Sequence, residues 1–110
     1  MEIRKKEVIK SEFYYIDIQD IYEYGEATFG LRLANSFFET ILETAENLES
    51  HYLLHPECRH LETKSKMYRN IILGSYLIIY RIQANRIEVL RAFHGSRSPK
   101  IMKEVRKIKL

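Results

Sequence analysis

Three apolar segments separated by very short links constrain the fold of this chain more than any other feature. Tyr68–Leu73, Tyr76–Ile82 and residues 86–93 are rich in Ile, Val, Leu and Tyr, which favour β-strands. Only Gly74-Ser75 and residues 83–85 separate them. Links this short cannot carry a parallel crossover, so the three strands must be antiparallel neighbours. The middle segment is apolar on both faces, which predicts a central strand covered on one face and lining a groove on the other.

Two amphipathic segments precede the strands. Ser11 is expected to cap a first helix that runs to Tyr24 and stops at Gly25. A second helix is expected from a cap at Thr28 to about Glu49, because its apolar residues recur at steps of three and four. These residues are Ala34, Phe37, Ile41, Ala45 and Leu48. The short break between the helices predicts a helical hairpin.

The two ends of the chain complete the predicted fold. Residues 5–9 are a modest strand candidate, and residues 51–67 have no clear period and are interpreted as a connecting loop. Ser98-Pro99 suits a helix start, and its expected inward stripe is Ile101, Val105 and Ile108. We therefore predict one α+β domain over residues 1–110. It has an N-terminal strand, a helical hairpin packed on an antiparallel sheet of about four strands, and a short C-terminal helix.

Formal charge is divided unevenly along the chain. The net charge is only +3, from 18 basic and 15 acidic side chains. Residues 1–57 hold 5 basic and 12 acidic side chains, whereas residues 58–110 hold 13 basic and 3 acidic ones. This division predicts an anionic partner for the second half, either RNA or an acidic protein segment.

Arginines set among apolar strand positions are the candidate binding residues. Arg81 and Arg91, with Tyr80, are expected to line the groove on the sheet. Alternation along the last strand gives Arg91 the same face as Val89 and Phe93. A partly covered arginine needs a carboxylate or phosphate partner. That partner is either a carboxylate of the acidic helices or the anionic partner in the groove, and the sequence leaves both open. The helical candidates are Glu39, Glu43 and Glu46.

Several classes of protein do not fit the sequence. Cys58 is the single cysteine, so the chain holds no internal disulfide and suits a reducing compartment. Its longest apolar stretch, residues 71–80, is shorter than the roughly 20 residues that span a bilayer. The spacing of His51, His55, Cys58 and His60 matches no metal motif, so we interpret them as loop residues. We expect a cytoplasmic protein with no metal, no cofactor and no membrane partner.

The order of several segments resembles the RelE/ParE toxins of bacterial type II toxin–antitoxin systems, and within them the ParE-like branch. The segments are residues 20–25, Phe29-Gly30, Tyr68-Arg69, residues 74–82 and residues 87–97, together with Ala34, Leu48 and Pro56. The resemblance covers nearly the whole chain. The fold that it implies, a helical hairpin on an antiparallel sheet, agrees with the prediction made from the pattern alone.

The resemblance implies three alternative functions. A ParE-like toxin poisons DNA gyrase by binding it, and this is the favoured hypothesis. A RelE-like toxin cleaves mRNA on the ribosome without a metal. A third possibility is a non-toxic relative that still binds an antitoxin. In each case the resemblance implies a cognate antitoxin, whose acidic, amphipathic segment would fold around the basic half in a toxin–antitoxin hetero-oligomer.

The nuclease pattern of the family is only partly present. In that chemistry a 2′-OH attacks the neighbouring phosphate, cations stabilise the developing charge, and an acid protonates the leaving oxygen. The resemblance implies Arg69, His94 and Arg97 as catalytic residues of a RelE-like enzyme. The arginine usual in the third strand is Leu77 here, and the C-terminal tyrosine of some members falls near Met102. These two departures count against RNA cleavage, although the resemblance implies that Leu77 is unusual for a ParE-like toxin as well.

Overall fold

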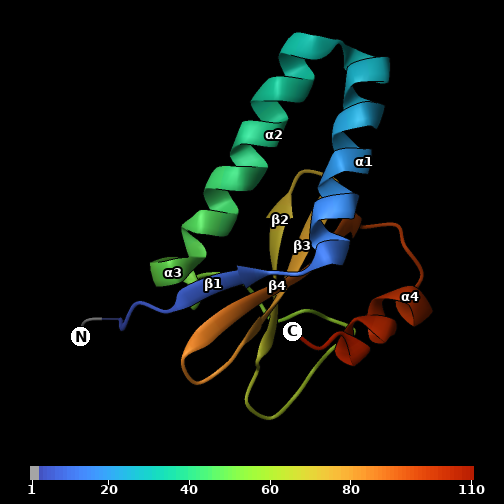
Figure 1. Cartoon of the computed structure of the whole chain (residues 1–110). Helices are drawn as coiled ribbons and strands as arrows, with labels where there is room; N and C mark the ends of the chain where they lie inside the picture. Colours follow the sequence, from blue (N-terminus) through green and yellow to red (C-terminus); the bar gives the residue numbers. More distant parts are fainter. Residues whose placement is uncertain (1–2) are drawn as a thin grey trace.

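The computed structural model describes residues 3–110, and residues 1 and 2 of the predicted domain lie outside this range. Two long helices stand over one face of a four-stranded sheet (Figure 1). The elements in chain order are β1 (Glu7–Lys10), α1 (Glu12–Phe29), α2 (Leu31–Glu46), α3 (Leu48–His51), β2 (Tyr68–Leu73), β3 (Tyr76–Ile82), β4 (Arg86–His94), α4 (Pro99–Lys103) and the 3₁₀ turn η1 (Glu104–Lys107). No helix of residues 3–110 has the length and apolar character needed to cross a membrane.

The sheet has the order β1-β4-β3-β2. Strands β2, β3 and β4 form the predicted antiparallel run, and β2 and β3 have the predicted bounds. Strand β1 differs, because it joins β4 in parallel from Glu7 opposite Arg86 to Lys10 opposite Val89. The long connection between β1 and β4 makes this pairing possible. The sheet is therefore mixed, with β1 and β2 at its two edges.

The turn of the helical hairpin lies five residues later than predicted. Helix α1 continues through Gly25 and ends at Phe29, and Gly30 separates it from α2 with a φ of 91°. A glycine ends a helix where the chain needs a positive φ, and that need arises at Gly30. Thr28 consequently lies inside α1 and caps nothing. At Gly25 a Cβ would stand 3.6 Å from the Cβ of Ala34, so this position faces α2 across the hairpin.

Ser11 fixes the start of α1 against the sheet. Its hydroxyl accepts a hydrogen bond from the Tyr14 backbone N–H at 3.0 Å and donates one to the Leu90 carbonyl at 2.5 Å. The predicted N-cap is therefore confirmed, and the same side chain ties the helix to β4. At the other end of the hairpin, α2 stops at Glu46 and the short α3 follows Asn47, so the predicted second helix is divided there.

A β-bulge changes which residues of β4 share a face. Tyr80 pairs with Val89, but the preceding residue Ile79 pairs with Arg91, so Leu90 is the extra residue. Val89 consequently packs with the helices, whereas Phe93 packs on the opposite face. The sequence-based prediction that Arg91 shares a face with Val89 is wrong for this reason.

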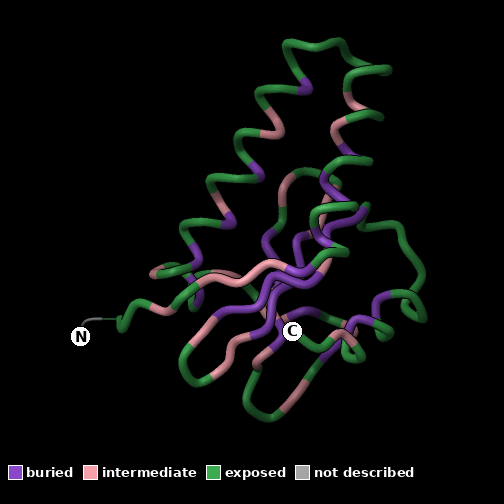
Figure 2. Tube along the Cα trace, in the orientation of Figure 1, coloured by how far each residue is buried: buried purple, intermediate pink, exposed green. Residues whose placement is uncertain are grey.

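Two buried clusters lie on the two faces of the sheet, and Figure 2 shows the buried stretches concentrated along the strands. On the helix side the largest buried members are Tyr14, Ile41, Leu48, Ile71, Ile78, Tyr80 and Ile87. On the other side they are Leu61, Tyr68, Ile79, Leu90, Phe93 and Met102. Segments of the 52–67 loop and of the C-terminal residues 98–110, here called the C-terminal strap, cover that second face.

The inward stripe of the C-terminal strap differs by one residue from the prediction. Ser98 caps α4 with Pro99 at its start, as predicted. Met102 and Val105 are buried and Ile108 is partly buried, whereas Ile101 is 39% exposed. A 3₁₀ turn has three residues per turn, so steps of three beginning at Met102 keep one face toward the sheet. The chain changes from α to 3₁₀ geometry at Glu104.

Candidate functional site

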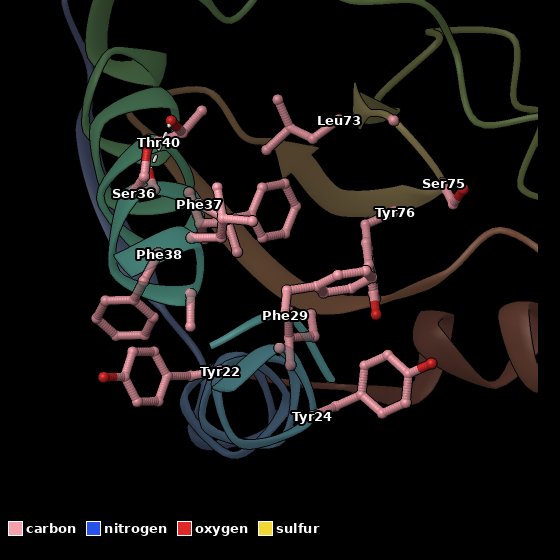
Figure 3. Close-up of a pocket in the computed structure, with 16 residues that line it drawn as sticks. Tyr22, Tyr24, Phe29, Ser36, Phe37, Phe38, Thr40, Leu73, Ser75 and Tyr76 are labelled. Carbon is pink, nitrogen blue, oxygen red and sulfur yellow. Dashed lines mark hydrogen bonds between the residues drawn. The ribbon is translucent and has the colours of Figure 1, made fainter. Parts of the chain in front are cut away.

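An apolar groove lies between the helical hairpin and the β2–β3 turn. This hairpin groove has a volume of about 460 Å³, and its aromatic lining surrounds the opening (Figure 3). The aromatic residues are Tyr22, Tyr24, Phe29, Phe37, Phe38 and Tyr76. They come from α1, α2 and the first residue of β3, so the groove exists only because the hairpin leans over the sheet.

Ring contacts and one hydrogen bond give the hairpin groove its shape. The rings of Phe37 and Tyr76 lie 5.6 Å apart, which joins α2 to β3. The rings of Tyr22 and Phe38 meet edge to face at 5.3 Å. The Tyr22 hydroxyl donates a 2.6 Å hydrogen bond to Asn35 Oδ1. These contacts tie both helices and the sheet together, so the groove is formed before any partner arrives.

Large apolar side chains are exposed at the tip of the hairpin. Phe29 is 63% exposed and Leu33 is 59% exposed, and both line the hairpin groove. Tyr24 and Leu31 are exposed beside them. Exposed apolar side chains gathered at one end of a molecule are a candidate protein-binding surface. The sequence analysis did not single out this site, although Phe29, Leu31 and Leu33 flank Gly30 on an otherwise polar turn.

A smaller, polar hollow of about 180 Å³ adjoins the groove at Tyr24 and Tyr76, which line both. It brings together His94 and Arg97, two of the three residues that the nuclease pattern implies. The Nδ1 atom of His94 accepts a 3.1 Å hydrogen bond from the Ser96 backbone N–H. Arg97 is exposed, and within residues 3–110 its guanidinium has no hydrogen-bond or ion-pair partner.

The third residue of the pattern, Arg69, lies elsewhere. Its guanidinium donates to the carbonyls of Leu53, His55 and Lys66 at 3.0 to 3.2 Å. Leu73 at the end of β2 pairs with Tyr76 of β3, and Tyr76 pairs with His94 of β4. Arg69 lies four positions before Leu73 along β2. At a strand rise of about 3.3 Å per residue, the separation along the strand is about 13 Å. The structure therefore joins His94 to Arg97 but not to Arg69.

Two of the predicted groove residues are buried. Arg81 donates to Glu88 Oε1 at 2.6 Å and to the Ile108 carbonyl at 2.8 Å. The hydroxyl of Tyr80 donates to the Tyr52 carbonyl at 2.7 Å. Burial raises the pKa of Tyr80 far above its usual value. The polar atoms of both residues are thus used inside the chain, where they hold the 52–67 loop and the C-terminal strap.

The third predicted groove residue, Arg91, pairs with an acidic helix. Its Nε and Nη2 atoms donate to the two oxygens of Asp17 at 2.6 and 2.8 Å. The Ala92 backbone N–H donates to Asp17 as well, at 2.9 Å. The partner is on α1 and is none of the three glutamates of α2 considered from the sequence. Asp17 lies three residues after Tyr14 on the inward face of α1, and a carboxylate in that position is the signal that could have identified it.

The two departures from the nuclease pattern have a packing role. Leu77 and Met102 both belong to the cluster beneath the C-terminal strap, and Met102 is only 3% exposed. A polar catalytic group at position 102 would lie in an apolar core, whereas Leu77 is partly buried and packs at the edge of that core. Throughout residues 3–110, no three His, Cys, Asp or Glu side chains lie close enough together to hold a metal ion.

Comparisons with known proteins agree with one another. Residues 16–99 match the model of the family described as the ParE toxin of type II toxin-antitoxin system, parDE. Among solved structures, a chain of the chromosomal ParDE TA system from P. aeruginosa is similar in fold, with a TM-score of 0.68 and 17% identity. The match covers 83% of this chain and 97% of that one. No functionally curated protein matches the sequence.

Proposed function

Because the chain belongs to the ParE toxin family of type II toxin–antitoxin systems, we propose that it stops growth by binding and inhibiting DNA gyrase, and that a cognate antitoxin neutralises it. The family match over residues 16–99 carries this proposal. The toxin would act as a single domain in the cytoplasm, where gyrase works. It would form a hetero-oligomer with its antitoxin.

The placement of the basic residues supports inhibition by binding over cleavage of mRNA. Stabilising a phosphorane charge needs several cations aimed at one point. Here Arg69 donates to three loop carbonyls and lies about 13 Å along the sheet from His94. The apolar residues Leu77 and Met102 occupy the other two positions of the pattern and supply no cation or proton. Only His94 and Arg97 share a hollow. That pair can bind an anionic group, but the rest of the nuclease pattern does not surround it.

The hairpin groove supports the antitoxin part of the proposal. An amphipathic segment could place apolar side chains on Phe29, Leu33 and Phe37, which line the groove. The adjoining hollow, which Asp17 and Asp20 also line, offers Arg97 and His94 to a carboxylate of the same segment. An amphipathic antitoxin segment would therefore bind here mainly through its apolar face, with one carboxylate placed at Arg97.

A supercoiling assay with purified gyrase tests the proposed target. The toxin should inhibit supercoiling in a dose-dependent way, and the antitoxin should reverse the effect.

The RelE-like alternative is tested with His94→Ala and Arg97→Ala in a translation-linked mRNA cleavage assay. Gyrase activity unchanged at any excess of toxin would refute the proposed target, and cleavage lost in both variants would support the nuclease instead. Induced expression without growth arrest would identify a non-toxic relative.

Antitoxin binding is tested at the tip of the hairpin. Leu33→Asp places a charge on the groove without disturbing the core, because Leu33 is 59% exposed. Binding of the short protein encoded beside the toxin should weaken by about tenfold or more, as expected at an apolar anchor. Leu54→Asp is the matched control, since Leu54 is 68% exposed and outside the groove. Equal affinities for the two variants would place the antitoxin elsewhere.

A further inference from the structure

A second hollow, separate from the hairpin groove, lies between the first turn of α1 and the C-terminal strap. We call it the strap hollow, and its volume is about 320 Å³. Apolar side chains line part of it: Phe13, Ile101, Val105 and Ile108. Phe13 is 50% exposed and Ile101 is 39% exposed. The hollow therefore offers apolar surface to a side chain that enters from solvent.

Cations surround this apolar surface. Arg91, Lys107 and Lys109 line the strap hollow, together with one acid, Glu104. Lys107 pairs with Glu104 at 2.9 Å, but both side chains are more than half exposed, so the pair is weak and Lys107 can exchange it for a carboxylate of a partner. Residues 97–110 contain six basic side chains against that single acid. The surroundings of the hollow are thus strongly positive.

Arg91, which lines this hollow, keeps one edge of its guanidinium free of the Asp17 pair. Asp17 occupies its Nε and Nη2 atoms. Within residues 3–110 the Nη1 atom makes no hydrogen bond, and the side chain is 30% exposed. The guanidinium also stands 5.7 Å from the centre of the Phe13 ring. A carboxylate reaching this edge would join a donor that is already held in position.

Internal contacts fix the C-terminal strap before any partner binds. Met102 and Val105 are buried against the sheet. Arg81 donates to the Ile108 carbonyl at 2.8 Å, and Arg86 donates to the Leu110 carbonyl at 3.0 Å. A preformed hollow loses little ordering entropy on binding, which favours affinity.

We propose that the strap hollow is the surface by which this toxin recognises its protein target, and that it takes a bulky apolar side chain flanked by carboxylates. This proposal rests on the proposed function, because it concerns the target of the toxin. The apolar side chain would contact Phe13 and Ile101 and provide most of the binding energy. The flanking carboxylates would meet Lys107, Lys109 and the free edge of Arg91, which speeds association and sets its salt dependence.

The chemistry of the hollow favours an acidic protein segment over nucleic acid. A phosphate backbone would use Lys107 and Lys109 but would gain nothing from Ile101, Val105 or Ile108. The hairpin groove is a poorer match to an acidic target, because residues 12–46 hold eight acids and one base. Charge complementarity therefore assigns the acidic target to the strap hollow.

Charge reversal at Lys107 and Lys109 tests whether the cations of the strap hollow bind the target. The toxin variant Lys107→Glu/Lys109→Glu should need at least about tenfold more protein for half-inhibition of gyrase supercoiling, and should lose growth arrest on induction. The control Arg59→Glu/Lys64→Glu changes net charge equally at exposed loop positions outside the hollow. That control should stay within about twofold of the wild type. Thermal unfolding of all variants shows that the fold is retained.

Truncation of Phe13 tests whether the apolar surface of the strap hollow binds a side chain of the target. Phe13→Ala should weaken inhibition by about tenfold, because the ring is the largest apolar contact in the hollow. Ile16→Ala is the matched control, since Ile16 is 60% exposed on α1 and outside the hollow. A duplex DNA oligonucleotide, followed by fluorescence anisotropy, serves as the nucleic-acid probe. If charge reversal abolishes DNA binding while Phe13→Ala leaves gyrase inhibition intact, the proposal is overturned.

The outcomes separate this proposal from the proposed function. If the wild type inhibits gyrase and the hollow variants inhibit it equally, the strap hollow is refuted and gyrase remains the target. If the wild type arrests growth without inhibiting gyrase, gyrase is refuted as the target. Growth arrest by the hollow variants, compared with the wild type, then tests the strap hollow. If the wild type neither inhibits gyrase nor arrests growth, both proposals fail.

Discussion

On one face of the sheet, α1 and α2 pack apolar side chains against β3 and β4. On the other face, the 52–67 loop and the C-terminal strap cover Ile79, Leu90 and Phe93 with little regular structure. Helices satisfy their own backbone hydrogen bonds, so side-chain packing alone can close the first face. Irregular segments leave carbonyl groups that need donors. The second face therefore requires polar side chains that the first does not.

Arginines of the basic half supply those donors. Arg69 donates to three carbonyls of the loop. Arg81 and Arg86 donate to carbonyls of the strap while both hold Glu88. Much of the positive charge in the strands is thus structural. Arg97 and the cations on the outer side of the strap are among those that remain available to a partner.

The largest loss of stability on the face covered by the strap is expected when Glu88, which is 1% exposed, loses its charge. Glu88→Gln leaves two arginines without their carboxylate, so the free energy of unfolding should fall by about 3 to 5 kcal/mol. Urea unfolding measures the change, and hydrogen exchange should show the strap opening. Glu104→Gln, at an exposed pair, should cost less than about 1 kcal/mol. Equal losses would mean that the buried pair does not hold the strap.

The carboxyl group of Glu88 also makes the free energy of unfolding depend on pH. Burial of Glu88 tends to raise its pKa, but hydrogen bonds and charges from Arg81, Gln83 and Arg86 outweigh burial and lower the pKa below its ordinary value. The stabilisation is therefore present above the ordinary glutamate pKa and is lost as the pH falls through the lower folded-state pKa. Acid unfolding of the wild type should show this loss, and Glu88→Gln should lack it.

The ion pair between Asp17 of α1 and Arg91 of β4 is the corresponding polar contact of the helical hairpin. Asp17→Asn removes a charge that accepts from Arg91 and from the Ala92 backbone. The loss should be about 2 to 3 kcal/mol, because hydrogen bonds to a charged group are worth more than neutral ones. The control is Asp20→Asn, three residues along α1 and exposed. A smaller effect at Asp17 than at Asp20 would contradict this account of the pair.

Met102 tests packing beneath the C-terminal strap. Met102→Tyr restores the residue type that some nuclease members of the superfamily carry, but it inserts a larger side chain into a filled core. Overpacking should lower stability by about 1 to 3 kcal/mol and create no mRNA cleavage. Ile101→Tyr, at the neighbouring exposed position, should change stability little. Cleavage activity in Met102→Tyr would contradict the packing role.

Two buried tyrosines on the helix side give the smallest effects. Tyr80→Phe removes a hydroxyl that donates to the Tyr52 carbonyl, and should cost about 1 kcal/mol. The Tyr14 hydroxyl is buried with no hydrogen-bond partner among residues 3–110, and burial raises its pKa to about 12. Tyr14→Phe should therefore be neutral or slightly stabilising. Thermal unfolding of the two variants side by side checks the difference, and a larger loss at Tyr14 would contradict it.

Features with a short-range cause were predicted well from the sequence. The bounds of β2 and β3 and the caps Ser11 and Ser98 follow from strand composition, turn length and local hydrogen bonds. Features that depend on distant contacts were missed. The sequence placed the hairpin turn at Gly25, but the two helices pack there, and Gly30 takes the positive φ.

By itself, the sequence determined the strand–hairpin–sheet order and the antiparallel run, because periodicity and turn length are local properties of a chain. Only the tertiary structure decided which arginines are free. Arg69, Arg81 and Arg91 are paired internally, and each has an acceptor that lies more than a dozen residues away in the sequence. The hairpin groove and the strap hollow likewise arise where distant elements meet, so no local pattern could predict them.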